Sequence, residues 1–197
     1  MMKIPYAVRD FHALITEDYL YLDRTDRIPI MEDLGKELLF LRPRRFGKSL
    51  WLSTLMNYYD VAKADDFEQL FGHLAIGQNP TPLRNQYMVM RWDFSEVESY
   101  GTVEQIRLSL YDQINTEIAI FAEEYADLLK TPIQIHPDNA LSSFKSAVAA
   151  VRRSRHKLYL FIDEYDNFAN EVMMVPKELH KVEESIYRNR YWQLVSG

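Results

Sequence analysis

Cysteine is absent from the 197 residues of this sequence. This absence excludes a disulfide-stapled fold, a thiol nucleophile and any zinc or iron–sulfur site held by cysteine, and it fits a reducing compartment. Six glycines and eight prolines are too few for a collagen-like or low-complexity chain. No two of the five histidines are spaced i, i+4, so we do not expect a histidine metal site.

Long apolar runs and an excess of positive charge are also missing. A membrane-spanning helix needs about 18 or more uncharged apolar residues, and no such stretch exists. Lys3, Arg9 and Asp10 interrupt the N-terminus, so it contains no signal-peptide core. The formal net charge of −6 argues against a protein that coats nucleic acid through bulk charge. We therefore expect a folded cytoplasmic protein with no membrane association.

Short apolar segments alternate with amphipathic ones along the chain. Leu38–Leu41 is uncharged and ends at Arg42-Pro43, which predicts a strand buried on both faces, as in a parallel sheet. We predict strands at 38–41, 86–94 and 158–162, and helices at 50–59, 102–129, 141–153, 166–174 and 177–194. Strands separated by helices predict an α/β fold, with helices flanking a parallel sheet.

The loop after the first predicted strand has the features of a phosphate-binding loop. Gly47 would allow a tight turn at the start of the next helix, where N–H groups without helical partners could hold phosphate oxygens. Lys48 would reach the β- and γ-phosphates, and the Ser49 hydroxyl would bind Mg²⁺. The candidate nucleotide contacts are Arg42, Pro43, Arg44, Arg45, Phe46, Gly47, Lys48, Ser49 and Leu50.

This motif is incomplete, because Arg42 stands where the pattern G-x-x-x-x-G-K-[ST] has its first glycine. A Gly-Lys-Ser turn at the start of a surface helix, within a solvated basic loop, is the alternative interpretation. Four cations within seven residues of an acidic protein favour an anion instead.

Acidic residues follow the third predicted strand, in the arrangement called Walker B. Asp163 would lie near the Mg²⁺, usually through water, and Glu164 would orient and deprotonate the attacking water. Lys48, Asp163 and Glu164 are thus the candidate catalytic residues, and Ser49 and Asp163 the candidate Mg²⁺ ligands. The alternative is an acidic helix N-terminus that favours the helix dipole.

Four segments together resemble the AAA-ATPase-like family, which is predominantly bacterial. They are ITEDYLYLDRT (15–25), LFLRPRRFGKSL (39–50), WDFS (92–95) and LFIDEYDNFANEV (160–172). The resemblance implies a P-loop NTPase-type domain that binds ATP and Mg²⁺ through Lys48, Ser49, Asp163 and Glu164. It also implies that arginine-proline replaces the usual start of the phosphate loop. Family members often carry a C-terminal nuclease-like domain.

The stretch 19–25 matches the family pattern Tyr-x-Tyr-x-Asp-[Lys/Arg]-Thr. Its place before the first predicted strand would make it a wall of the adenine pocket. Alternating tyrosines are equally ordinary in an edge strand.

The family domain continues beyond the end of this sequence. A strand carrying a polar sensor residue is expected between 38–41 and 158–162, and nothing after Ile162 is typical of one. We therefore expect 1–197 to be a single domain that is incomplete at its C-terminus. Unpaired strand edges would then favour weak nucleotide binding, slow turnover and self-association.

Three functions remain open on the sequence alone. The first is a Mg²⁺-dependent ATPase that regulates an effector domain absent from this chain. The second is a nucleotide- or nucleic-acid-binding module without turnover, suggested by the basic clusters at 42–48 and 152–157. The run 152–157 is also typical of an ordinary solvated surface. The third is an inert fragment that binds a partner through the helix 102–129.

Overall fold

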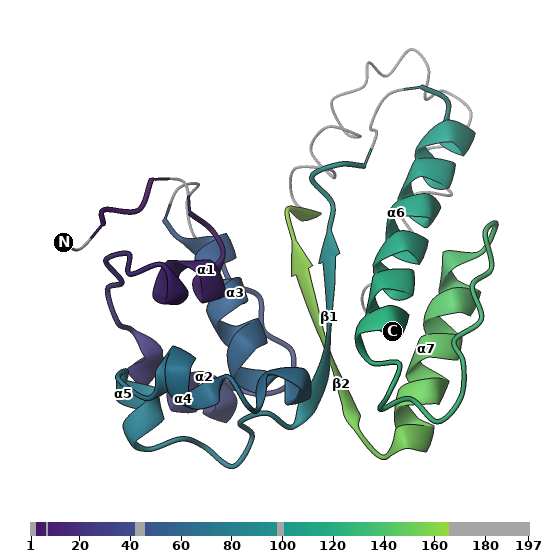
Figure 1. Cartoon of the computed structure of the whole chain (residues 1–197). Coiled ribbons are helices and arrows are strands. Elements are labelled where there is room, and N and C mark those ends of the chain that lie inside the picture. Colours follow the sequence, from purple (N-terminus) through teal and green to yellow (C-terminus); the bar gives the residue numbers. More distant parts are fainter. Residues whose placement is uncertain (1–2, 7, 42–45, 98–100, 166–197) are drawn as a thin grey trace.

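The computed structural model describes residues 3–6, 8–41, 46–97 and 101–165. Figure 1 shows a narrow sheet with helices on both sides. The elements in chain order are α1 (Phe11–Thr16), α2 (Ile28–Leu34), α3 (Lys48–Tyr59), α4 (Phe67–Phe71), α5 (Ala75–Gln78), β1 (Tyr87–Asp93), α6 (Val103–Glu124), α7 (Ala140–Ser154) and β2 (Lys157–Asp163). Single 3₁₀ turns occur at Thr25–Arg27 and Val61–Lys63.

The two strands are parallel, with Tyr87 opposite Lys157 and Asp93 opposite Asp163. Parallel strands need a long crossover connection, and α6 and α7 provide it. The predicted strands at 86–94 and 158–162 are confirmed, as are the α/β class and the helices at 50–59 and 141–153. The predicted helix 102–129 is confirmed as far as Glu124. The helices predicted at 166–174 and 177–194 lie outside the described residues.

The prediction of a buried strand at Leu38–Leu41 is wrong. No strand is assigned there, and the side chains of Leu39 and Leu41 are 67% and 75% exposed. An apolar run becomes a strand only where a neighbouring strand pairs with its backbone, and the described sheet contains β1 and β2 alone. The described chain at residues 38–41 is therefore irregular, not a strand.

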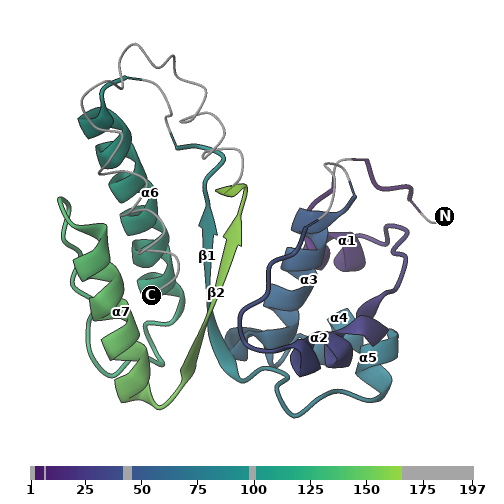
Figure 2. The ribbon, with the colours of Figure 1, turned by 180° about the vertical axis from the view of Figure 1, so that it is seen from behind.

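Each face of the sheet is covered by its own hydrophobic cluster. Alternate residues of a strand point to opposite faces, which separates the odd-numbered from the even-numbered side chains. Tyr87, Val89, Tyr159 and Phe161 pack with α1–α5, whereas Met88, Met90, Leu158 and Leu160 pack with α6 and α7. Figure 2 shows the α6–α7 layer from behind. Within the described part of the chain, every helix is too short or too polar to cross a lipid bilayer.

The local sequence explains where the long crossover helices begin. The Thr102 side chain accepts a hydrogen bond from the N–H of Gln105, whose side chain accepts one from the N–H of Thr102. Asn139 caps α7 by accepting from the N–H of Ser142. The apolar stripe of α6 is buried against the sheet at Ile118 and Phe121. This half of the stripe packs within the chain, which weakens the idea of a partner-binding surface on this helix.

Candidate functional site

Gly47 is the residue directly before α3, at its N-cap, and it has the left-handed conformation, with φ of +75°. Residues with a Cβ adopt this conformation only with strain, so the turn requires glycine, as the sequence predicts. Lys48 and Ser49 form the first helical turn and are half-buried. The first N–H groups of a helix lack helical partners, so this turn can hold an anion. Leu50 packs against the hydrophobic cluster on the α3 side of the sheet.

The loop ahead of this turn is described only in part. Phe46 is exposed, and Arg42, Pro43, Arg44 and Arg45 lie outside the described residues. Their predicted contacts with a nucleotide therefore stay predictions.

Asp163 is the last residue of β2, and its side chain is only 6% exposed. One carboxylate oxygen accepts a hydrogen bond of 3.1 Å from the N–H of Glu164. Glu164 has φ of +55°, an uncommon conformation for a residue with a side chain, so the chain turns sharply after the strand. Strained backbone of this kind is found at functional sites more often than elsewhere.

Arg91 joins the ends of both strands. Its Nη2 atom lies 2.6 Å from a carboxylate oxygen of Asp93 and 3.4 Å from one of Asp163. All three residues are odd-numbered and therefore belong to the face that α3 covers. The WDFS segment carries part of the family resemblance, but neither its Asp93 nor the preceding Arg91 was predicted to be a site residue. The usable signal was that the carboxyl ends of neighbouring parallel strands meet at one edge of a sheet.

A cavity of about 480 Å³ lies between α3 and β1, and its lining also includes both acidic and basic side chains from other segments, namely Arg9, Asp10, His12, Asp60, Lys63 and Glu124. Ser49, Ser53 and Asn57 line it from one face of α3, and Val89 and Arg91 line it from β1. Cavities of this size suit small ligands. Ser49 and Arg91 thus share one cavity, and Arg91 connects it to the buried carboxylate of Asp163.

Carboxylates dominate the electrostatics around Arg91. Burial is the main cause that raises the pKa of the half-buried Glu117 on α6. The nearby Arg91 lowers this pKa, and the carboxylates of Asp93 and Glu96 raise it further. A cation at this position therefore offsets several nearby negative charges.

The predicted Mg²⁺ ligands have suitable chemistry. A serine hydroxyl and a carboxylate are hard oxygen donors, which Mg²⁺ prefers. Among the described residues, no three His, Cys, Asp or Glu side chains are grouped to hold a metal ion. Mg²⁺ is usually bound by one or two carboxylates together with substrate phosphates and water. Asp163 does not line the cavity that Ser49 lines, so a Mg²⁺ site shared by Ser49 and Asp163 stays a prediction.

The tyrosine-rich stretch 19–25 has a structural role. Asp23 accepts hydrogen bonds from the N–H groups of Thr25 (2.8 Å) and Ala75 (2.7 Å). The Thr25 hydroxyl in turn accepts from the N–H of Ile76, at 3.1 Å. These bonds fasten the N-terminal segment to the start of α5. No residue of 19–25 lines the cavity between α3 and β1, and the adenine-pocket wall stays a prediction.

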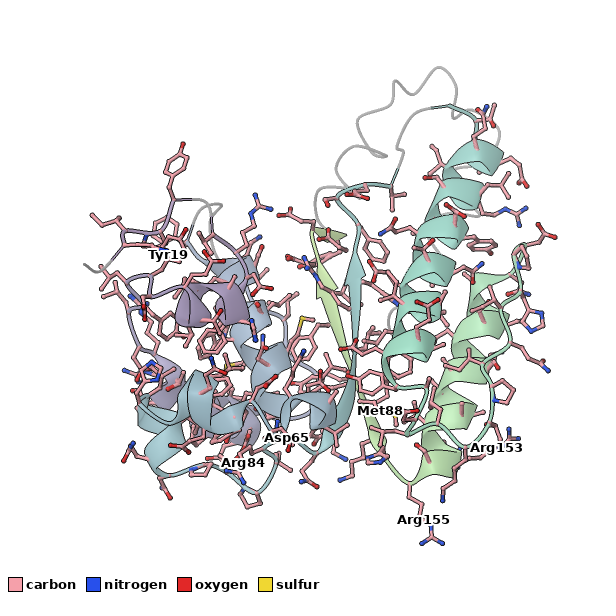
Figure 3. All side chains as sticks on the ribbon, viewed as in Figure 1. Tyr19, Asp65, Arg84, Met88, Arg153 and Arg155 are labelled. Carbon is pink, nitrogen blue, oxygen red and sulfur yellow. The ribbon has the colours of Figure 1, made fainter. Side chains whose placement is uncertain are left out.

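The basic run 152–157 lies at the opposite end of the sheet from Asp163. It covers the last turn of α7 and the start of β2. Figure 3 shows Arg153 and Arg155 at this end. Cations in the last turn of a helix favour its dipole, which agrees with the interpretation as an ordinary surface run.

A family model described as predicted AAA-ATPase matches residues 5–196, nearly the whole chain. The chain belongs to the AAA-ATPase-like family. This confirms the resemblance found in the sequence, and membership of the AAA-ATPase-like family indicates nucleotide binding without assigning residues to it. No curated protein and no solved structure matches the chain.

Proposed function

We propose that this AAA-ATPase-like chain binds ATP with Mg²⁺ at residues 42–50 and hydrolyses it. The observation that carries the proposal is the left-handed Gly47, which opens α3 directly before Lys48 and Ser49. A glycine turn followed by lysine and serine at a helix N-terminus is the arrangement with which P-loops bind phosphate groups.

Each residue then has a defined role. Lys48 would bind the β- and γ-phosphates, while Ser49 and Asp163 would hold the Mg²⁺. Bound Mg²⁺ would neutralise charge on the phosphates. Glu164 orients a water and accepts its proton as the water oxygen bonds to the terminal phosphorus. The bond from that phosphorus to the β–γ bridging oxygen breaks, which releases ADP and inorganic phosphate. By the family resemblance, turnover would regulate an attached effector domain.

Nucleotide binding without turnover is the second candidate function. Leu38–Leu41 does not join the described sheet, so no pairing between strands fixes Ser49 relative to Asp163. Mg²⁺ demands near-ideal octahedral geometry and tolerates little displacement of its ligands.

Lys48→Ala tests the phosphate-binding turn. A charge-assisted contact is worth roughly 1.5–3 kcal/mol, so Mg²⁺-ATP should bind about 10- to 150-fold more weakly by calorimetry. Lys145→Ala is the matched control, because Lys145 is an exposed lysine on α7. Unchanged ATP binding by folded Lys48→Ala protein would refute the proposed site.

Glu164→Gln separates the two candidate functions. A base acts only on the attacking water, so ATP affinity should persist while phosphate release falls. If Glu164→Gln instead nearly abolishes ATP binding, while the ATP that still binds is hydrolysed at the wild-type rate, the role assigned to Glu164 is wrong. Wild-type protein that binds ATP but releases no phosphate would favour the second candidate.

A further inference from the structure

Arg91 places a positive charge in the cavity that Ser49 also lines, and the function proposed above assigns no role to Arg91. Its side chain is 42% exposed, so a ligand can reach the guanidinium. Arg91 lies on β1, one strand away from Asp163, and both residues belong to the face that α3 covers. A negatively charged ligand at the start of α3 would therefore meet this guanidinium across the cavity.

The two ion pairs of Arg91 are unequal. The 2.6 Å contact with Asp93 is short, and the other oxygen of Asp93 accepts a hydrogen bond from the N–H of Ser95. The 3.4 Å contact with Asp163 is long and therefore weaker. Asp93 is thus the anchor of the guanidinium, and Asp163 is the partner that it can give up.

The guanidinium has donors to spare. Both ion pairs use Nη2, and within the described part of the chain neither Nη1 nor Nε forms a hydrogen bond. A guanidinium carries five N–H donors in a planar fork that matches the geometry of phosphate oxygens. Arg91 can therefore keep Asp93 and bind a phosphate group at the same time.

We propose that Arg91, held by Asp93, contacts the terminal phosphate of the bound nucleotide and makes the site prefer triphosphate to diphosphate. The proposal rests on the nucleotide site proposed above. With nucleotide and Mg²⁺ bound, Asp163 would serve as a ligand of the Mg²⁺ in place of its long contact with Arg91. The released donors of Arg91 then face the phosphate that ADP lacks.

The test compares the affinities of the full chain for Mg²⁺-ATP and Mg²⁺-ADP by calorimetry. Arg91→Met should weaken ATP binding about tenfold or more and change ADP binding less than about twofold. Arg91→Lys, which keeps the charge but loses the fork, should recover part of the preference. Arg107→Met is the matched control, because Arg107 pairs with Glu104 on the exposed surface of α6.

The outcomes separate this proposal from the nucleotide site itself. If Arg91 only holds Asp163 in place, Arg91→Met affects ATP and ADP equally, and that result overturns the proposal. Lys48→Ala should weaken both nucleotides, and no change there refutes the site rather than the role of Arg91. If Arg91→Met does not fold by circular dichroism, Asp93→Asn replaces it. Without the Asp93 carboxylate, the guanidinium of Arg91 is held less firmly, so Asp93→Asn should also lower the ratio of ATP to ADP affinity. An unchanged ratio overturns the proposal.

Discussion

The two faces of the β1–β2 sheet are built from alternate side chains of the same strands, yet they differ along their length. The face under α6 and α7 carries apolar side chains, with Met88 and Met90 fully buried. The face under α3 begins with packed aromatic residues such as Tyr159 and Phe161, and it ends in Arg91 and the strand-end carboxylates. The face under α6 and α7 is therefore apolar along its whole length, whereas the face under α3 changes from a packed apolar core to the charged candidate site.

This difference shows how a narrow sheet combines stability with chemistry. Charged groups concentrate at the carboxyl end of one face, where the strands stop and the cavity beside α3 begins. The opposite face is free of them and supports the strands from behind. We expect substitutions under α6 to change stability, and substitutions at the strand ends to change ligand binding.

Phe121→Ala, on α6, should have the largest effect on stability. Phe121 is buried, and the centroid of its ring lies 4.7 Å from the centroid of the Tyr125 ring. Truncation of a buried phenylalanine leaves a cavity and costs about 3–5 kcal/mol. Urea denaturation at 25 °C should therefore show a large loss in the free energy of unfolding. Nucleotide affinity per folded molecule should stay within about twofold of wild type. A folded variant that has lost nucleotide binding would show that the two faces are not separable.

Sequence patterns predicted β1, β2, α3, α6 and α7 because each has enough periodic apolar residues to identify it. The pattern failed at Leu38–Leu41, where apolarity was present but no neighbouring strand was. The short helices α1, α2, α4 and α5 were missed, since they span at most two turns and form through tertiary packing.

The candidate site was predicted in the same uneven way. Gly47 was identified because a chemical motif fixes its neighbours, and its left-handed φ agrees with the expected turn. Arg91 was missed, because the meeting of the strand ends indicates only the edge of the sheet, while the role of Arg91 depends on strand register and on its distance from Asp163.

Tyr125→Phe should have a smaller effect, at the boundary between the faces. The Tyr125 hydroxyl donates to the buried Asp60 at 2.6 Å and accepts from the N–H of Val89 on the outer edge of β1, at 2.9 Å. Loss of the hydroxyl weakens the support of a buried carboxylate and leaves the N–H of Val89 without this acceptor. We expect a loss of about 2–4 kcal/mol in the free energy of unfolding.

Tyr6→Phe is the control for this change, because Tyr6 is 94% exposed. It should leave the denaturation midpoint unchanged. If Tyr125→Phe is equally silent, the edge of β1 does not depend on α6, and the link between the two faces is wrong.

Asp60→Asn should have the smallest effect, which appears in the pH dependence of stability. Burial raises the pKa of the Asp60 carboxyl above its ordinary value, although Tyr125, the N–H of Ala62 and Lys63 act to lower it. The native state therefore binds this proton more tightly than the unfolded state does. The cost of burying the charge is present at neutral pH and disappears as the pH falls through the folded pKa. Asparagine keeps an oxygen that can accept from Tyr125 but carries no charge.

The free energy of unfolding of Asp60→Asn relative to wild type should therefore be higher at pH 7 than at pH 4.5, where more of the folded wild-type Asp60 carboxyl is protonated. Urea titrations at several pH values measure this difference. Burial also raises the pKa of Glu124, and the Asp60 carboxylate raises it further, so Asp60→Asn relieves part of the charge cost of Glu124 as well, in the same direction. Asp65→Asn, at an exposed position, should show no such pH dependence. If the Asp60→Asn difference is constant with pH, the charge on Asp60 carries no burial cost. If it is larger at pH 4.5, that charge stabilises the fold instead.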